Sequence, residues 1–190
     1  MGLLLTGSTD HALLGLVIQE AAKEAKLQDA FVGRTAVQKI LYFLRVVGVP
    51  MSYRFDIHHY GPFCEEILRD VDWLLADNAI IDHSDNPSRY SNYAPGETIN
   101  DLLSVHRDFL EPFRSHVQTI VQALVPLKPT KLELVATLDY LYRQQRASGG
   151  LGPWKPSVVA RFQEVKEGKF SQADVEKTYD VLAQAGLVEP

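Results

Sequence analysis

The chain has 190 residues, of which 46% are hydrophobic and 23% are charged, and its net charge is −5. This composition is ordinary for a globular protein and excludes wholesale disorder. Cys64 is the only cysteine, which excludes an internal disulfide and a cysteine-based metal cluster. No apolar run approaches the roughly 20 residues that a membrane-spanning helix needs. A secretory signal is also not recognisable, so we expect a cytoplasmic protein that does not enter the membrane.

The negative charge is concentrated in the first half of the chain. Residues 1–100 contain 8 Lys/Arg and 13 Asp/Glu, a net charge of −5, whereas residues 101–190 contain 11 of each and are neutral. A domain that binds nucleic acid over much of its surface is usually basic. The charge distribution therefore argues against such a surface in the first half.

The first sixty residues predict two helices and a strand. Thr9 or Asp10 can cap a helix that runs to about Lys26 with apolar residues at helical spacing. A second apolar helix is predicted from its N-cap, Thr35, to a stop at Gly48. Residues 52–57 alternate in polarity, which indicates a short strand.

The segment from Tyr60 to Ile81, YGPFCEEILRDVDWLLADNAII, is the most informative one. The Gly-Pro pair predicts a break followed by a helix that begins at Pro62, because proline suits the first helical position. Residues 80–83 and 89–93 predict two short strands, joined by a run of turn-forming residues. A helix followed by such a pair of strands is typical of the third helix and the wing of a winged-helix domain.

The second half of the chain predicts further helices. Residues 98–124 keep helical phase across Pro112, where the helix should kink or split. This segment could form a homodimer seam, or a pair of helices that covers the winged core. Additional helices are predicted over residues 131–146, residues 157–166 and a last segment that begins at the capping residue Ser171.

Together these elements predict a mostly helical α+β protein. We expect a winged-helix-like core with a small antiparallel sheet over residues 1–97. Residues 98–190 are expected to form a helical extension packed on that core, so that the whole chain is one compact unit.

Several of these segments resemble the bacterial YwgA-like proteins. Gly33–Thr35 followed by Val37–Leu44 is similar to their "lQKllYll" helix, and Tyr60–Asp70 to their "YGP(F/Y)s.el..dl" segment. Leu132–Leu141 and Phe170–Leu187 extend the likeness over most of the chain. The family is related, more distantly, to the SocA-like antitoxins, also called the Panacea domain. That resemblance implies a helical or winged unit that binds a partner protein and has no established catalytic residues.

The charge of the third predicted helix favours a protein partner. Its segment contains five carboxylates and a single Arg69, a net charge of −4, which would repel the phosphates of DNA. We therefore predict a non-enzymatic, antitoxin-like or adaptor-like module whose partner is a basic protein, for example a toxin that handles nucleic acid. The candidate partner-binding residues are Tyr60, Phe63, Glu65, Glu66, Arg69, Asp70 and Asp72.

Two alternatives remain open at this stage. The first is a winged-helix transcription regulator that grips DNA phosphates through Arg34, Lys39, Arg45 and Arg89. The second is a thiol enzyme, in which Cys64 at a helix N-terminus would use His58 or His59 as its base. Against the enzyme, Glu65 and Glu66 adjoin Cys64 and should raise its pKa. The histidines also lack the spacing of a metal-ligand pair, so we expect neither a metal nor a cofactor.

Overall fold

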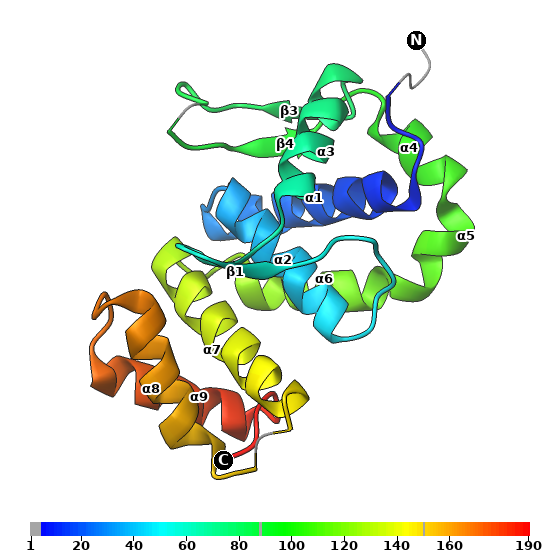
Figure 1. Cartoon of the computed structure of the whole chain (residues 1–190). Helices are drawn as coiled ribbons and strands as arrows, with labels where there is room; N and C mark the ends of the chain where they lie inside the picture. Colours follow the sequence, from blue (N-terminus) through cyan, green and yellow to red (C-terminus); the bar gives the residue numbers. More distant parts are fainter. Residues whose placement is uncertain (1–4, 88, 150) are drawn as a thin grey trace. The chain divides into compact units, whose positions relative to one another are not determined.

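A computed structural model of the chain describes residues 5–87, 89–149 and 151–190 (Figure 1). The described chain is mostly helical, with two small two-stranded sheets, β1–β2 and β3–β4, which confirms the α+β prediction. It divides into two compact units. The N-terminal unit comprises Met1–Phe55 and Phe63–Pro129, and the C-terminal unit comprises Asp56–Pro62 and Thr130–Pro190. This division lies elsewhere than the expected boundary at residue 97. The winged-helix part of the prediction stays a prediction.

The central helix of the N-terminal unit is α1, Thr9–Gln28, in which every residue from His11 to Ile18 is buried. Its N-cap is Ser8, whose hydroxyl accepts the backbone N–H of His11 at 3.1 Å. The predicted caps Thr9 and Asp10 are therefore wrong by one or two positions. Helices α2, Arg34–Val46, and α6, Arg114–Leu124, both pack against α1. Gly33 precedes α2 without a side-chain cap, so the prediction of Thr35 as a cap is also wrong.

The Gly-Pro pair begins a strand instead of a helix. Strand β1 is Asp56–His58, shorter than the predicted 52–57, and β2 is Gly61–Phe63. Gly61 has a φ of 90°, a conformation that glycine adopts without steric cost and that lets the chain turn into β2. Helix α3 therefore begins at Glu65 and ends at Ala76, and Pro62 is not its first residue.

Strands β3, Ile80–Asp82, and β4, Tyr93–Pro95, pair antiparallel with Ile81 opposite Ala94. The predicted second strand, 89–93, thus ends where β4 begins. The reason lies in the preceding turn, where the backbone N–H groups of Arg89 and Tyr90 both donate to the carbonyl of Asn86. Those donors are consequently not available to a ladder with β3.

The segment after β4 forms three short helical pieces before α6. Helix α4 is Ile99–Val105, α5 is Arg107–Leu110, and a 3-10 turn spans Glu111–Phe113. Pro112 lies in that turn, which confirms the predicted split at the proline. Most of the apolar side chains of this segment are buried within one chain, namely Ile99, Leu102, Leu103, Leu110, Val117, Val121 and Leu124, whereas Val105 is 72% exposed.

The C-terminal unit is built on three helices, α7 (Pro129–Ala147), α8 (Trp154–Lys166) and α9 (Gln172–Gln184). They enclose a separate apolar core that includes Leu138, Phe162 and Tyr179. Helices α7 and α8 begin two and three residues earlier than predicted. The predicted cap of the last helix is confirmed, because the Ser171 hydroxyl accepts the N–H of Asp174 at 3.1 Å.

Residues 56–62 are held on this unit by polar side chains. The Tyr140 hydroxyl donates to Asp56 at 3.3 Å, and the Lys166 ammonium donates to the carbonyl of His59 at 2.6 Å. Among the helices that the structure describes, none has both the length and the apolar run that crossing a bilayer requires.

Candidate protein-interaction surface

Helix α3 presents two faces with different composition. Residues spaced three and four apart lie on the same side of a helix, so one side can face the protein interior and the other side solvent. The buried face consists of Ile67, Asp70, Val71 and Leu74. The exposed face consists of Glu65, Glu66, Arg69, Asp72 and Trp73. We call these five exposed residues the acidic α3 face; its formal charge is −2, from three carboxylates and one guanidinium.

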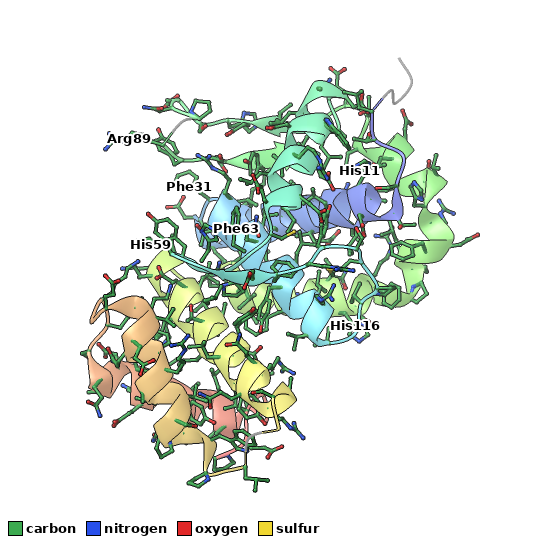
Figure 2. The ribbon with its side chains drawn as sticks, in the orientation of Figure 1. His11, Phe31, His59, Phe63, Arg89 and His116 are labelled. Carbon is green, nitrogen blue, oxygen red and sulfur yellow. The ribbon has the colours of Figure 1, made fainter. Side chains whose placement is uncertain are left out.

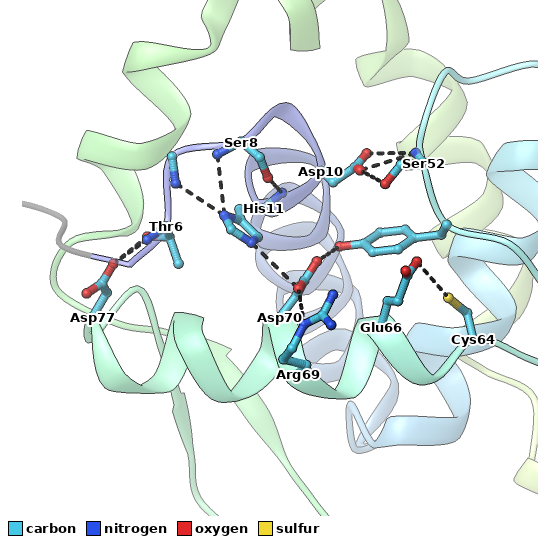
Figure 3. A network of polar contacts seen from close by, with 12 residues as sticks. Thr6, Ser8, Asp10, His11, Ser52, Cys64, Glu66, Arg69, Asp70 and Asp77 are labelled. Carbon is cyan, nitrogen blue, oxygen red and sulfur yellow. Dashed lines mark hydrogen bonds and ion pairs between the residues drawn. The ribbon is translucent and has the colours of Figure 1, made fainter.

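Asp70 belongs to the buried face, which corrects its predicted place on the partner-binding surface. Only 6% of this residue is exposed, and its Oδ2 accepts the Tyr53 hydroxyl at 2.7 Å (Figure 3). Its Oδ1 lies 3.7 Å from His11 Nε2 and 3.8 Å from Arg69 Nε. The carboxylate is therefore compensated inside the unit and does not face a partner.

His11 completes this buried network from α1. Its Nδ1 accepts the backbone N–H groups of Gly7 at 3.2 Å and Ser8 at 3.4 Å. A neutral imidazole that accepts at Nδ1 carries its proton on Nε2, which here points at Asp70 (Figure 3). The chain of contacts from His11 through Asp70 to Tyr53 thus connects α1, α3 and the segment that follows α2. It fixes the rotation of α3 and hence which side chains that helix exposes.

Burial changes the pKa of Tyr53, the third residue of this network. It raises the pKa of the Tyr53 phenol above its usual range, and the hydrogen bond to Asp70 acts in the same direction. Both effects favour the protonated phenol, which can donate its hydrogen bond to Asp70.

Trp73 is positioned by the same network and is 37% exposed. The edge of its ring meets His11 at a centroid distance of 5.5 Å. The Arg69 guanidinium lies 5.4 Å from its ring centroid, at cation–π distance. A large aromatic side chain is thus held in one place among Glu66, Arg69 and Asp72, where it can contact a partner.

The first turn of α3 is fixed by Gln38, a buried residue of α2. Its amide donates to the carbonyl of Cys64 at 2.8 Å and accepts the N–H of Cys64 at 3.0 Å. Burial raises the pKa of the Cys64 thiol, and the Glu66 carboxylate, 4.0 Å from the sulfur, adds to this effect. Both effects favour the protonated thiol, which is a poor nucleophile. His58 and His59 belong to the other unit.

The opposite end of α3 is tied to residues 5 and 6. Asp77 Oδ2 accepts the backbone N–H of Leu5 at 2.9 Å and of Thr6 at 2.8 Å. The Thr6 hydroxyl donates to the same oxygen at 2.7 Å (Figure 3). Asp77 is consequently engaged within the N-terminal unit, and the charge available to a partner comes from the acidic α3 face.

Two predicted partner-binding residues lie outside α3. Tyr60 is 60% exposed and belongs to the C-terminal unit, where the Lys169 ammonium lies 5.0 Å from its ring centroid. Phe63 is half-buried at the end of β2 and belongs to the N-terminal unit. The structure therefore brings together Glu65, Glu66, Arg69 and Asp72, but assigns Tyr60 to the other unit.

The four residues considered for DNA binding have different surroundings. Lys39 is only 2% exposed and lies in the interior. Arg34 donates to the carbonyl of Pro87 at 2.9 Å, and Arg45 donates to that of Tyr53 at 2.6 Å. Arg89 is exposed (Figure 2). Lys39 is thus removed from any phosphate-binding surface, and both Arg34 and Arg45 already support the backbone.

Sequence reasoning missed the roles of His11 and Tyr53. The burial of Asp70 could have been predicted, because this residue lies three residues after Ile67 and four before Leu74 and so falls on the apolar side of its helix. Its buried partners come from positions 59 and 17 residues away and no local pattern indicates them. Among the described residues, no group of three His, Cys, Asp or Glu side chains is placed to hold a metal ion.

The chain is 23% identical over 124 residues to the uncharacterized protein YwgA of Bacillus subtilis (strain 168), an alignment that covers 62% of this chain and 74% of YwgA. This similarity supports a YwgA-like family. No protein-family model matches the chain.

Proposed function

We propose that this YwgA-like protein is a non-enzymatic interaction module that binds a basic partner protein through the acidic α3 face. The observation that carries the proposal is that Glu65, Glu66 and Asp72 are exposed on the same helix as Trp73, which is 37% exposed. Tryptophan is enriched among the residues that contribute most to binding, and polar and charged residues commonly form the rim around such an anchor.

The way in which Trp73 is held supports this proposal. His11 and Arg69 already restrict the ring, so that binding a partner costs little additional side-chain entropy. The carboxylates, in contrast, are exposed and well hydrated. Their expected contribution is to guide a basic partner to the surface and to orient it, and less to the final affinity.

The order of elements in the N-terminal unit is compatible with a winged-helix-like module. Helices α1, α2 and α3 precede the antiparallel pair β3–β4, the order expected for three helices and a wing. The motifs resemble the YwgA-like proteins, which are related more distantly to the SocA-like antitoxins, and with this order they support a function as an antitoxin or adaptor. A toxin with a basic active site is the kind of partner that the acidic α3 face fits.

The competing function is that of a transcription regulator. Arg89 is exposed and Tyr90 is 51% exposed, and both could contact a DNA backbone. A mobility-shift assay at low and high salt separates the two functions, since binding through phosphate contacts weakens steeply with salt.

The decisive experiment is capture of the product of the neighbouring gene after co-expression. The triple variant Glu65→Lys, Glu66→Lys, Asp72→Lys should lose most of the captured partner. Trp73→Ala should weaken binding on the order of 30-fold, the effect of removing a strong interface anchor. The matched control reverses three exposed carboxylates elsewhere in the N-terminal unit, Glu97, Asp101 and Asp108.

The two triple variants change the net charge by the same amount, so a difference in partner binding between them depends on the position of the charges. If the proposal holds, only the α3 variant loses the partner. The control should bind like the wild type. Equal loss in both would indicate a general effect of charge, and unchanged binding in the α3 variant would show that the partner uses another surface.

A further inference from the structure

A second surface of the N-terminal unit contains two arginines and two exposed aromatic side chains. Phe31 is 75% exposed and Tyr90 is 51% exposed, in a protein where most other aromatic rings are covered. Two positive charges accompany them, from Arg34, which donates to the carbonyl of Pro87, and from the exposed Arg89. Figure 2 shows Phe31 and Arg89. We call these four residues the wing-side basic surface.

Hydrogen bonds place the two parts of this surface next to each other. The Val32 carbonyl accepts the N–H of Tyr93 at 2.9 Å, and the Arg34 guanidinium donates to the Pro87 carbonyl at 2.9 Å. Residues 31–34, which connect α1 to α2, therefore run beside the residues that lead into β4. Phe31 and Tyr90 thus belong to neighbouring segments of the N-terminal unit, and both are exposed to solvent.

We infer that the wing-side basic surface binds the acidic α3 face of a second copy of this chain, which forms a weak, salt-sensitive dimer. The charges of the two surfaces can pair: Arg34 and Arg89 are complementary to the carboxylates of the acidic α3 face, and the flanking Asp29 and Asp85 are complementary to its Arg69. Each surface also has an exposed aromatic anchor, with Trp73 opposite Phe31 and Tyr90. The inference rests on the proposed function, because it names a second copy as a partner of the same helix face.

Because the two surfaces differ, their contact either closes reciprocally into a two-fold dimer or continues into an open chain of copies, and the dimer is the closed form that we infer. In a two-fold dimer each contact occurs twice, with the α3 face of each protomer against the basic surface of its partner. The dimer would hide the acidic α3 face until a stronger basic partner displaced the second copy.

The local charges favour a protein occupant over single-stranded nucleic acid. Exposed aspartates, Asp29 and Asp85, flank the wing-side basic surface and would repel a chain of phosphates. The α3 face contains Arg69, a cation that can pair with these aspartates. A nucleic acid strand has no such group to offset the repulsion.

The test is a charge-swap experiment with the full chain, monitored by sedimentation and light scattering over a wide range of concentration. The wild type should form dimers at low salt that dissociate at high salt. Arg89→Glu alone should raise the dimer dissociation constant at least about ten-fold. The double variant Arg34→Glu, Arg89→Glu and the triple α3 variant of the preceding section should each be monomeric.

A mixture of these two monomeric variants provides the sharpest result. All contacts between unlike protomers are then attractive, whereas all contacts between like protomers are repulsive, so a heterodimer should form. Circular dichroism checks that each variant folds, and Arg89→Glu keeps the test valid if Arg34→Glu disturbs the loop through its bond to Pro87.

Three outcomes would overturn the inference. They are a wild type that is monomeric at all concentrations at low salt, a dimer that neither reversal affects, and salt-sensitive binding of a labelled oligothymidylate that Arg89→Glu abolishes. If the monomeric wild type still captures the neighbouring gene product through α3, the dimer fails while the proposed function stands. If the triple α3 variant has the same oligomeric mass as the wild type and captures the neighbouring gene product equally well, both the dimer and the proposed function are wrong.

Discussion

Asp70 shows how one buried carboxylate determines what its helix exposes. Its carboxylate accepts a hydrogen bond from Tyr53 and lies close to His11. A rotation of α3 about its axis would move this carboxylate away from both residues. Desolvated polar groups of this kind cost free energy when a partner is removed, which makes the network a constraint on geometry more than a source of net stability. With Asp70 held toward the interior, the rotation of α3 places Glu65, Glu66 and Asp72 on the solvent side.

The first prediction concerns this residue. Asp70→Ala should lower the free energy of unfolding by about 3 kcal/mol, because it leaves the Tyr53 hydroxyl and His11 Nε2 buried without an acceptor. Tyr53→Phe should cost less, about 1–2 kcal/mol, since His11 keeps its contact with Asp70. Urea denaturation measures both. Asp72→Ala, on the exposed face of the same helix, is the control and should change stability by no more than about 0.5 kcal/mol.

A second prediction concerns alkaline pH and Tyr179. Burial raises the pKa of this phenol to about 12, with smaller contributions from Tyr142 and Glu189. The folded protein therefore keeps a proton that the unfolded chain releases near pH 10. Its contribution to stability is fully present below pH 10 and is lost as the pH rises toward about 12, with a slope of at most about 1.4 kcal/mol per pH unit.

Urea denaturation at about pH 9 and about pH 11 tests this dependence. In the wild type the Tyr179 hydroxyl donates to the carbonyl of Glu189 at 2.6 Å, so Tyr179→Phe should be less stable than the wild type at the lower pH. The variant should, however, lose less stability than the wild type when the pH is raised from the lower to the higher value. Tyr90→Phe removes an exposed phenol and should keep the wild-type dependence. An identical loss in Tyr179→Phe and the wild type would mean that other groups cause the alkaline effect.

At the scale of elements, the β3–β4 pair depends on one carboxylate at its open end. Asp82 Oδ1 accepts the N–H of Ser84 at 2.9 Å and of Asn92 at 2.8 Å. Burial opposes ionisation of Asp82, but these backbone donors outweigh it and lower its pKa. The side chain thus stabilises the turn that precedes β4 and holds Tyr90 and Arg89 in place.

The third prediction follows from that lowered pKa. Asp82 contributes stability above pH 3.8, its ordinary value, and the contribution is lost as the pH falls through its lower folded value. Asp82→Ala should weaken the strand pair by about 1–2 kcal/mol at neutral pH and should abolish this part of the acid dependence. Hydrogen exchange at the amides of Ser84 and Asn92 measures the effect. Unchanged exchange there would show that the backbone pairing alone holds the turn.

The elements also show which parts of the fold the sequence could predict. Long helices such as α1, α2 and α7 were found because their apolar spacing extends over many residues, and the split at Pro112 followed from proline chemistry. The start of α3 was misplaced because Pro62 fits a first helical turn and an edge strand equally well. Only the left-handed Gly61, set by the turn before it, decides between them.

The candidate site was predictable to a similar degree. The exposed carboxylates of α3 followed from composition, and strict use of the helical period would have moved Asp70 inside. The partners His11 and Tyr53 depend on long-range packing, which no local pattern contains. Lys39 was misjudged for the same reason, since α2 is covered on nearly all sides and a lysine at an apparently exposed position is buried.

At the scale of the whole molecule, the chain crosses between its two units after Phe55, after Pro62 and after Pro129. Within the C-terminal unit, a buried ion pair holds the inserted residues. Glu133 is 2% exposed, with the ammonium groups of Lys166 and Lys169 at 3.0 Å and 2.8 Å. Burial lowers the pKa of Lys166, although Glu133 opposes this shift.

The last prediction uses this pair and the two tryptophans, since Trp73 belongs to the N-terminal unit and Trp154 to the C-terminal unit. Glu133→Ala leaves the Lys166 ammonium buried without its carboxylate and should destabilise the C-terminal unit by about 3 kcal/mol. Replacing both partners, Glu133→Leu with Lys166→Met, should restore most of that loss, because no buried charge is then unpaired.

Fluorescence in urea follows each unit separately when the other tryptophan is replaced by phenylalanine. Because each unit has its own core, Glu133→Ala should lower the unfolding midpoint reported by Trp154 and leave that of Trp73 nearly unchanged. Asp70→Ala should have the reverse effect. Equal shifts of both midpoints in both variants would show instead that the three chain crossings make the units unfold as one cooperative structure.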